Sequence, residues 1–243
     1  MMFKEPSTPL PLINFLRQYS SVSRRAILQK IASGLVRVNG TVIWDAQHAL
    51  TGTDAVYMDQ VLIQPQPVQY YRFHKPVGVV STMDDPKNRS CLAHYIAKNR
   101  LPRTLRPIGR LDRDSSGLLL FSNDGMFIHR VLHPSHAIAK MYRITVDAPL
   151  RERSKRQFRE GFFLEDGPVQ GTIERVFSPR DVLVSITMGR NRILRRAFAH
   201  MGYTIQTLHR TGIGGISLGS LAPGAFAAMD ADCIKTLVSQ SIT

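Results

Sequence analysis

The sequence of 243 residues predicts an α+β protein built from two unequal domains. Beyond residue 69, strand-like and helix-like segments follow one another irregularly, which favours an α+β domain over a regular βαβ array. Residues 64–69 hold two prolines and three glutamines, a composition typical of an extended linker. Apolar residues make up 43% of the chain, enough to bury a core on both sides of that linker.

The small domain is expected at residues 11–63, after a flexible tail at residues 1–10. A short helix near 12–16 precedes a clearer helix at 23–34, which Ser23 can cap and a glycine can end. Residues 35–43 then predict a hairpin around Asn39-Gly40, a pair that tolerates positive φ at both turn positions.

The basic side chains of this domain form the first candidate site. Residues 17–37 contain five basic residues and no acid. A solvated helix face is the ordinary explanation of such a run, but basic helices beside a hairpin suit contacts to backbone phosphates. The candidate phosphate-binding residues here are Arg24, Arg25, Lys30 and Arg37.

The large domain is expected at residues 70–243 as a mixture of strands and helices. Predicted strands cover 70–73, 117–121, 142–146, 181–187 and 203–209. Predicted helices cover 92–99, 127–132, 152–160 and 191–201. Period-two alternation of apolar residues supports the strand at 142–146, and an apolar stripe with a period of 3.6 supports the helix at 191–201.

Charge and cysteine content restrict the classes of function. Lys and Arg total 32 against 18 Asp and Glu, so the formal charge is +14, which favours a polyanionic partner such as nucleic acid or an anionic membrane surface. The two cysteines, far apart, fit neither a disulfide framework nor a zinc site. The sequence has no apolar run of about 18 residues and no signal-like start. We therefore expect a cytoplasmic protein with no metal and no membrane contact.

An acid among arginines is the most informative feature of the large domain. Residues 98–113 carry six basic residues and one acid, Asp112, just before an apolar strand. Nearby positive charge keeps such a carboxylate ionised, so it can act as nucleophile, electrostatic stabiliser or base. A surface ion pair is the alternative. Asp114, two residues on, does not complete a glycosidase pair and is interpreted as structural.

The helix predicted at 191–201 supplies the expected partner of this acid. Leu194 and Phe198 belong to its apolar stripe, and Arg195 lies at the edge of that stripe, where a partly buried guanidinium needs an anion. Asp112 is the expected anion. Arg192 and Arg196 would then be free for phosphates. An amphipathic surface helix without a special pair is the alternative.

Two further residues have both an ordinary and a functional interpretation. Tyr142 alternates with apolar neighbours on a strand, as a core tyrosine would, although the same ring could stack on an RNA base. Lys75 follows the first strand of the large domain and either meets phosphate or is simply exposed.

Three motifs together resemble the RsuA-type pseudouridine synthases. They are His74-Lys75-Pro76-x-Gly78, Gly109-Arg110-Leu111-Asp112 and Asn191-Arg192-x-x-Arg195-Arg196, in the family's order and at similar spacing. The segment from Ser23 to Gly40 is similar to the small RNA-binding domain that these enzymes share with ribosomal protein S-four. The resemblance implies a mixed, largely antiparallel sheet flanked by helices.

The resemblance also implies a reaction, the isomerisation of uridine in RNA to pseudouridine without cofactor or metal. By position, Asp112 matches the essential carboxylate, Tyr142 the tyrosine that stacks on the target base, and Arg195 the arginine that pairs with the aspartate. Arg110 and Arg113 are expected to meet RNA phosphate or to stabilise the loop. The first step stays open between attack on ribose, attack on the ring and removal of a ribose proton.

We expect a monomer acting on ribosomal RNA. Transfer RNA as substrate, or a non-catalytic RNA-binding factor in ribosome assembly, are the alternatives. The chain departs from the family pattern at Ile193, Ala197 and Ala227, which concerns the grip on substrate rather than the three matched residues.

Overall fold

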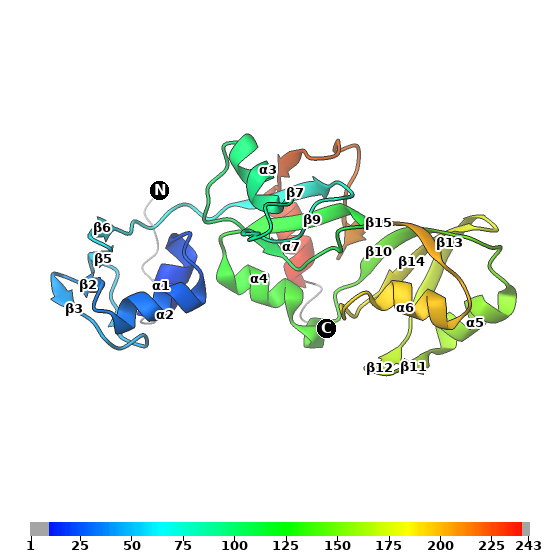
Figure 1. Cartoon of the computed structure of the whole chain (residues 1–243), viewed down its shortest axis with the longest axis horizontal. Coiled ribbons are helices and arrows are strands. Elements are labelled where there is room, and N and C mark those ends of the chain that lie inside the picture. Colours follow the sequence, from blue (N-terminus) through cyan, green and yellow to red (C-terminus); the bar gives the residue numbers. More distant parts are fainter. Residues whose placement is uncertain (1–9, 240–243) are drawn as a thin grey trace. The chain divides into compact units, whose positions relative to one another are not determined.

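The computed structural model describes residues 10–239 and separates into two compact units (Figure 1). The small unit extends to Gln69 and includes the loop Pro102–Leu105, and the large unit holds the rest. The predicted tail at 1–10 lies outside the described residues, apart from Leu10, which begins the first strand.

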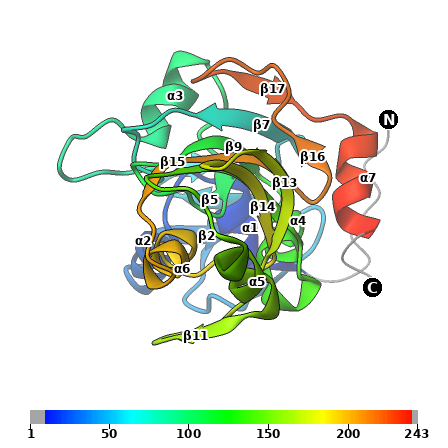
Figure 2. The ribbon, with the colours of Figure 1, turned by 90° about the vertical axis from the view of Figure 1, so that its right-hand side faces the viewer.

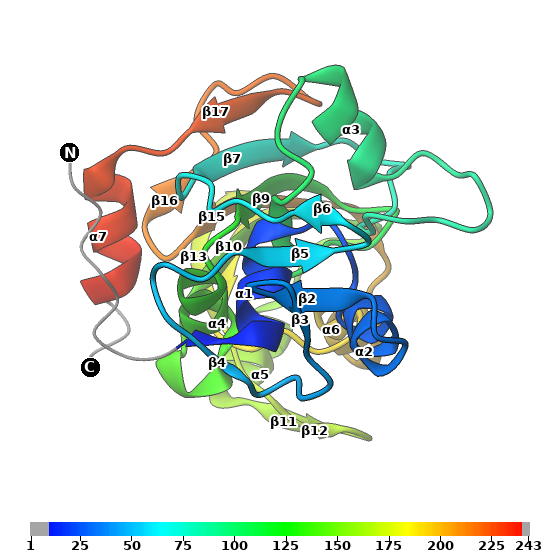
Figure 3. The ribbon, with the colours of Figure 1, turned by 90° about the vertical axis from the view of Figure 1, so that its left-hand side faces the viewer.

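The small unit packs two helices against a four-stranded antiparallel sheet of order β3-β2-β5-β6 (Figure 3). The helices are α1 (Leu12–Tyr19) and α2 (Arg24–Ala32), and the sheet strands are β2 (Val36–Val38), β3 (Thr41–Val42), β5 (Val56–Met58) and β6 (Val61–Leu62). A separate pair is formed by β1 (Leu10–Pro11) and β4 (Ala49–Leu50).

Local sequence explains the ends of these elements. The Ser23 hydroxyl accepts a hydrogen bond from the Ala26 N–H at 3.3 Å and caps α2, as predicted. Asn39 and Gly40 turn β2 into β3 with φ of 51° and 86°, the positive values that the predicted tight turn requires. Val36 and Val38 point inward to α1 and α2, so Arg37 lies on the outer face of the sheet.

The large unit is built on a nine-stranded sheet, counted among the described residues, of order β13-β14-β10-β15-β9-β7-β17. Strand β16 pairs with β15, and β8 with β9. The strands are β7 (Tyr70–Lys75), β8 (Arg106–Ile108), β9 (Ser116–Ser122), β10 (Lys140–Val146), β13 (Thr172–Ser178), β14 (Asp181–Ile186), β15 (Ile205–Ile213), β16 (Ile216–Ser217) and β17 (Phe226–Ala228). Every pairing is antiparallel except β15 with β9, so the predicted mixed, largely antiparallel sheet is confirmed.

Helices flank this sheet, and a hairpin extends from it. The helices are α3 (Leu92–Lys98), α4 (Gly125–Leu132), α5 (Glu152–Glu160), α6 (Ile193–His200) and α7 (Ala231–Ser239), with a 3-10 turn at Pro134–His136. The hairpin strands are β11 (Phe162–Leu164) and β12 (Gly167–Val169). Helices α5 and α6 lie together beneath β14 (Figure 2), where the Phe158 and Phe198 rings are 5.7 Å apart in a fully buried core.

Several predicted boundaries differ from the structure by one to four residues, and two of these differences are informative. The helix expected from residue 191 begins at Ile193, because Arg192 adopts a left-handed conformation with φ of 46°. The strand expected at 203–209 instead begins at Ile205 and runs on to Ile213, where it also pairs with β16.

The parallel contact between β9 and β15 depends on a glycine. Gly117 has φ of +109°, and a Cβ added there would lie 2.2 Å from the carbonyl oxygen of Arg210. Only glycine permits so close a backbone approach. The Asp112 loop, which leads into β9, is thereby held beside the middle of β15.

Candidate active site

The three sequence motifs come together near one cavity of about 860 Å³ in the large unit. Its walls come from the loop after β8, from β10 and β15, from the segment between β14 and α6, and from the β11–β12 hairpin. Its polar lining includes Arg110, Asp112, Ser115, Lys140, Tyr142, Asp166, Arg190, Arg192 and Arg210. The volume falls within the range of small-molecule sites, so a flipped nucleotide fits its scale.

The Asp112 loop is held on both sides of the acid. The buried Ser81 hydroxyl donates to the Leu111 carbonyl at 2.5 Å and accepts from the Leu111 N–H at 3.1 Å. On the other side, the Ser115 N–H donates to the Asp112 carbonyl at 3.1 Å. Asp112 therefore presents its half-exposed carboxylate from a fixed turn.

Lys75 supports this loop from beneath instead of contacting RNA. Its side chain is completely buried, and Nζ donates to the Ser115 carbonyl at 2.7 Å and the Pro76 carbonyl at 2.9 Å. Burial lowers the pKa of Lys75 to about 8, against the opposing effect of Asp112 and Asp114. The prediction that Lys75 binds RNA is therefore wrong, because no phosphate reaches a completely buried amine.

Arg195 pairs with Asp114, not with Asp112 as predicted. Its Nε lies 3.2 Å from Asp114 Oδ2, while Nη2 donates to the Asp114 carbonyl at 2.9 Å and Nη1 to the Ile205 carbonyl at 3.1 Å. Among the described residues no ion pair joins Arg195 to Asp112. Arg195 instead binds Asp114, which lies two residues after Asp112 on the same loop.

Arg192 is the ion-pair partner of Asp112. Its Nη1 lies 3.8 Å from Asp112 Oδ2, and its two terminal nitrogens each donate to one oxygen of Asp114 at 3.1 Å. Partial burial opposes ionisation of Asp114, but the Arg192 hydrogen bonds and the charges of Arg195 and Arg192 outweigh it and hold the pKa of this carboxyl below its usual value. Asp114 thus has the structural role expected of it.

The other arginine predicted to be free is also paired. Arg196 Nη2 lies 2.6 Å from Asp166 Oδ2, and Arg190 Nη1 lies 2.9 Å from the other oxygen of the same acid. These contacts tie the start of α6 to the β11–β12 hairpin. The expectation that Arg192 and Arg196 stand free for phosphates is therefore corrected for both residues.

Tyr142 shares the cavity wall with residues that the motifs did not single out. It lies on β10 directly opposite Arg210 of β15, whose Nη1 donates to the tyrosine hydroxyl at 3.3 Å. Lys140, two residues earlier on the same strand, donates from Nζ to the Thr187 carbonyl at 2.8 Å. Strand alternation carries Lys140 to the face of Tyr142, and this was the available sequence signal for it.

The remaining candidates of the large unit are exposed. Arg110 lines the cavity, and Arg113 lies beside it on the loop, with Nε 3.4 Å from the Gly78 carbonyl. Both therefore stay available to RNA near Asp112.

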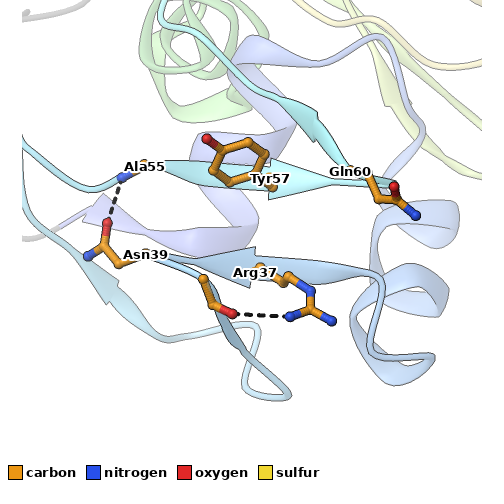
Figure 4. A pocket seen from close by; sticks show the side chains of 6 residues that line it. Arg37, Asn39, Ala55, Tyr57 and Gln60 are labelled. Atoms are coloured by element: carbon orange, nitrogen blue, oxygen red, sulfur yellow. Dashed lines mark hydrogen bonds between the residues drawn. The ribbon is translucent and has the colours of Figure 1, made fainter.

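The small unit keeps its candidates at the surface. Arg24 and Arg25 are exposed in the first turn of α2, and Lys30 pairs with Asp59 at 2.7 Å. Arg37 donates to the Gly40 carbonyl at 3.2 Å and lies beside Tyr57 in a shallow hollow on the outer sheet face (Figure 4).

Within residues 10–239, no cluster of three or more His, Cys, Asp or Glu side chains could hold a metal ion. No helix in the same range is long and apolar enough to cross a membrane.

The cavity holds two carboxylates, Asp112 and Asp166, among several cationic side chains. Residues 69–200 match the family model of RNA pseudouridylate synthase. The chain is 36% identical to an RNA pseudouridine synthase of Mycobacterium tuberculosis, over 91% of this chain and 90% of that protein. It is 32% identical to ribosomal small subunit pseudouridine synthase A of Escherichia coli K12, over 93% of this chain and 99% of that protein.

A solved structure agrees with these relatives. The crystal structure of a pseudouridylate synthase superimposes with a TM-score of 0.68 and 27% identity, covering 94% of this chain and 99% of that one. The chain belongs to the RNA pseudouridylate synthase family. It is therefore an isomerase that converts uridine to pseudouridine in RNA.

Proposed function

We propose that this enzyme modifies a uridine of ribosomal RNA and that Asp112 is its essential carboxylate. The observation that carries the residue assignment is the position of Asp112, held from both sides in a cavity that also contains Tyr142. The choice of RNA is supported by the E. coli relative, whose name places its action on the small ribosomal subunit.

The reaction breaks the bond between ribose C1′ and uracil N1 and forms a bond between C1′ and C5. The proton on C5 leaves, and N1 gains a proton, so the product is an isomer of the substrate. An ionised carboxylate can perform any of the three possible first steps: attack on ribose, attack on the ring or removal of a ribose proton. Arg192 Nη1 lies 3.8 Å from Asp112 Oδ2 and places a positive charge beside this carboxylate.

The target base must leave its stack to reach such a cavity. Tyr142 offers an aromatic face for the flipped uracil, since single-stranded bases stack readily on tyrosine. Arg195 acts through Asp114, by fixing α6 to the loop that carries Asp112. We assign Arg195 a positioning role on this basis.

The exposed basic residues supply the grip on RNA. In the large unit these are Arg110 and Arg113, and in the small unit Arg24, Arg25 and Arg37. Lys30, Arg192 and Arg196 reach phosphate only by giving up their present carboxylate partners. Phosphate contacts of this kind position the RNA without reading its sequence.

The test is release of tritium from C5 of labelled uracil in RNA from cells that lack the gene. Ribosomal RNA and transfer RNA are assayed separately, and pseudouridine is mapped in both. The wild type should release tritium from ribosomal RNA, and Asp112→Asn should abolish release while RNA affinity persists. Asp232→Asn, an exposed acid on α7, is the matched control and should behave as wild type.

Each alternative predicts its own outcome. Tritium release from transfer RNA alone would show that transfer RNA, not ribosomal RNA, is the substrate. Equal inactivity of wild type and Asp112→Asn on every cellular RNA, with binding intact, would favour a non-catalytic RNA-binding factor.

A further inference from the structure

Arg210 is a buried cation whose bonding is incomplete. Its side chain lines the active-site cavity, yet the residue is only 4% exposed. Nε donates to the Leu118 carbonyl at 2.7 Å, and Nη1 donates to the Tyr142 hydroxyl at 3.3 Å. Nη2 is buried and has no hydrogen-bond partner among the described residues.

Such a donor is costly to leave unpaired. A buried guanidinium nitrogen has lost its water and, without an acceptor, gains nothing in return. In a native protein an unpaired buried polar atom calls for an explanation, and a binding or catalytic role is one of them. No ion pair offsets the charge of Arg210 within the part of the chain described.

The surroundings add to the positive charge. Arg210 contributes to lowering the pKa of Lys140 and of Lys75, after burial, which is the larger cause for both amines. A partner of Nη2 must therefore be an electron-rich acceptor, and negative charge appearing on it would be stabilised in this partly buried region.

A second unpaired atom lies in the same wall. The Ser115 hydroxyl is fully buried, lines the cavity and has no hydrogen-bond partner among the described residues. The side of the cavity formed by the start of β9 and the middle of β15 thus presents two unsatisfied polar atoms. This wall is suited to a ligand with hydrogen-bonding groups of its own.

The position of Arg210 favours a base over a phosphate. Its guanidinium carbon lies over the Tyr142 ring, 5.9 Å from the ring centre, so it is close to the aromatic ring proposed to stack on the base. A phosphate keeps much of its hydration and meets positive charge at the exposed Arg110 and Arg113. A flipped base, by contrast, is read in a closed pocket by hydrogen bonds to its edge and by stacking.

We propose that Nη2 of Arg210 donates a hydrogen bond to a carbonyl oxygen of the target uracil. The inference rests on the proposed function, which places that base on Tyr142. When the bond between C1′ and N1 breaks, its electron pair stays with uracil, and the charge spreads over the ring nitrogens and both carbonyl oxygens. The guanidinium stabilises that charge until C1′ bonds to C5, the C5 proton leaves and N1 is protonated.

The experiment exchanges single atoms of the substrate. Synthetic RNA around the mapped uridine carries tritium at C5 and has sulfur in place of O2 or of O4, because sulfur accepts hydrogen bonds poorly. For the wild type, one of the two substitutions should slow single-turnover tritium release by about 100-fold, the effect of losing one preorganised donor. The affected atom identifies the carbonyl that Arg210 holds.

The variant Arg210→Met is tested on the unmodified and on the sulfur-substituted RNA. On unmodified RNA it should release tritium about 100-fold more slowly than wild type, and the sulfur substitution should slow it no further. Equal sulfur effects in wild type and variant would overturn the proposal. Arg210→Lys keeps the charge but loses the planar fork, so it should recover only part of the rate.

Arg143→Met is the matched control. Arg143 is an exposed arginine on β10, paired with Asp181 at 2.6 Å, and its loss should leave the rate and the sulfur effect unchanged. Melting temperature and RNA affinity report whether Arg210→Met folds. Should it not fold, the wild type alone decides, because absence of a sulfur effect at both O2 and O4 overturns the proposal.

Different results would refute the proposed function and the role of Arg210. If the wild type releases no tritium from any RNA, the proposed function fails and this assignment fails with it. If the wild type turns over and neither sulfur substitution matters, only the role of Arg210 is refuted.

Discussion

Lys140 places an amine of lowered pKa in the same cavity as Asp112. Burial lowers the pKa of Lys140 to about 8, and the nearby charge of Arg210 acts in the same direction. The amine is therefore mostly charged at neutral pH and neutral above about pH 8. Raising the pH through this value removes one positive charge from a site that must hold an anionic substrate.

The tritium-release rate should therefore depend on pH, and the substitution Lys140→Arg tests whether Lys140 is the cause. Single-turnover tritium release by the wild type should fall as the pH rises past about 8, because Lys140 deprotonates. Lys140→Arg keeps its charge throughout, so its rate should hold to higher pH. Lys75 has a similar pKa of about 8 and is unchanged in both proteins. Identical profiles for the two proteins would assign the fall to Lys75 or another group.

At the scale of elements, ion pairs join the loop that carries Asp112 to α6. Asp114 binds Arg192 through both carboxylate oxygens and also binds Arg195, so one acid links the loop to the start of the helix. The pKa of Asp114 is lowered, so its stabilising effect is present at neutral pH and is lost as the pH falls below the usual carboxyl value. Its side chain is 49% exposed, which limits the effect to about 1 kcal/mol or less.

Asp114→Asn should therefore impair activity more than stability. We expect a melting-temperature loss of a few degrees at pH 7, shrinking toward zero below pH 4, and a clear fall in tritium-release rate with RNA affinity retained. Asp181→Asn breaks a comparable pair with Arg143 outside the cavity and should cost stability alone. Equal rates for both variants would deny the link a role in positioning.

The junction of β9 and β15 yields a prediction about packing. In Gly117→Ala the new methyl group would lie 2.2 Å from the Arg210 carbonyl oxygen, and φ of +109° is strained for alanine. We expect a loss of about 2–4 kcal/mol in urea unfolding, from overpacking and backbone strain together. Gly125→Ala is the control, since a Cβ at Gly125 meets no atom within 4 Å. Similar midpoints for the two variants would contradict the close approach.

At the scale of the whole molecule, features that depend on neighbouring residues were predicted better than contacts between residues distant in sequence. Helix α5 has the predicted bounds, Glu152–Glu160, and the Asn39-Gly40 turn forms as its residues require. Both depend on neighbours in sequence. Helix α7, by contrast, was not predicted, although its Cys233, Ile234 and Leu237 pack against the core.

Partners distant in sequence were harder to predict. Asp112 and Asp114 stand two residues apart on one loop, so only the folded chain decides which of them Arg195 binds. Lys75 ends a strand in a motif that looks exposed, and the loop that covers it lies 40 residues away. Arg210 was not predicted as a site residue. Its partner Tyr142 lies on another strand, and the unpaired Nη2 is visible only in the folded structure.

RNA binding by the small unit can be judged from its own surface. Arg24 and Arg25 are exposed in the first turn of α2, which contains no acid, and we expect them to contact RNA phosphate. Each phosphate contact releases counterions, and the logarithm of affinity therefore falls with the logarithm of salt concentration, by a slope of about 0.7 per contact on single strands.

Replacing both residues with glutamine should weaken RNA binding and flatten this salt dependence by about 1.4 slope units. The tritium-release rate at saturating RNA should change little, because the cavity belongs to the large unit. A variant with glutamine at Arg153 and Arg156, both exposed on α5, removes the same charge and serves as control. If its slope falls equally, general charge rather than local contact explains the binding, and an unchanged slope in the Arg24 and Arg25 variant would place the RNA contacts elsewhere.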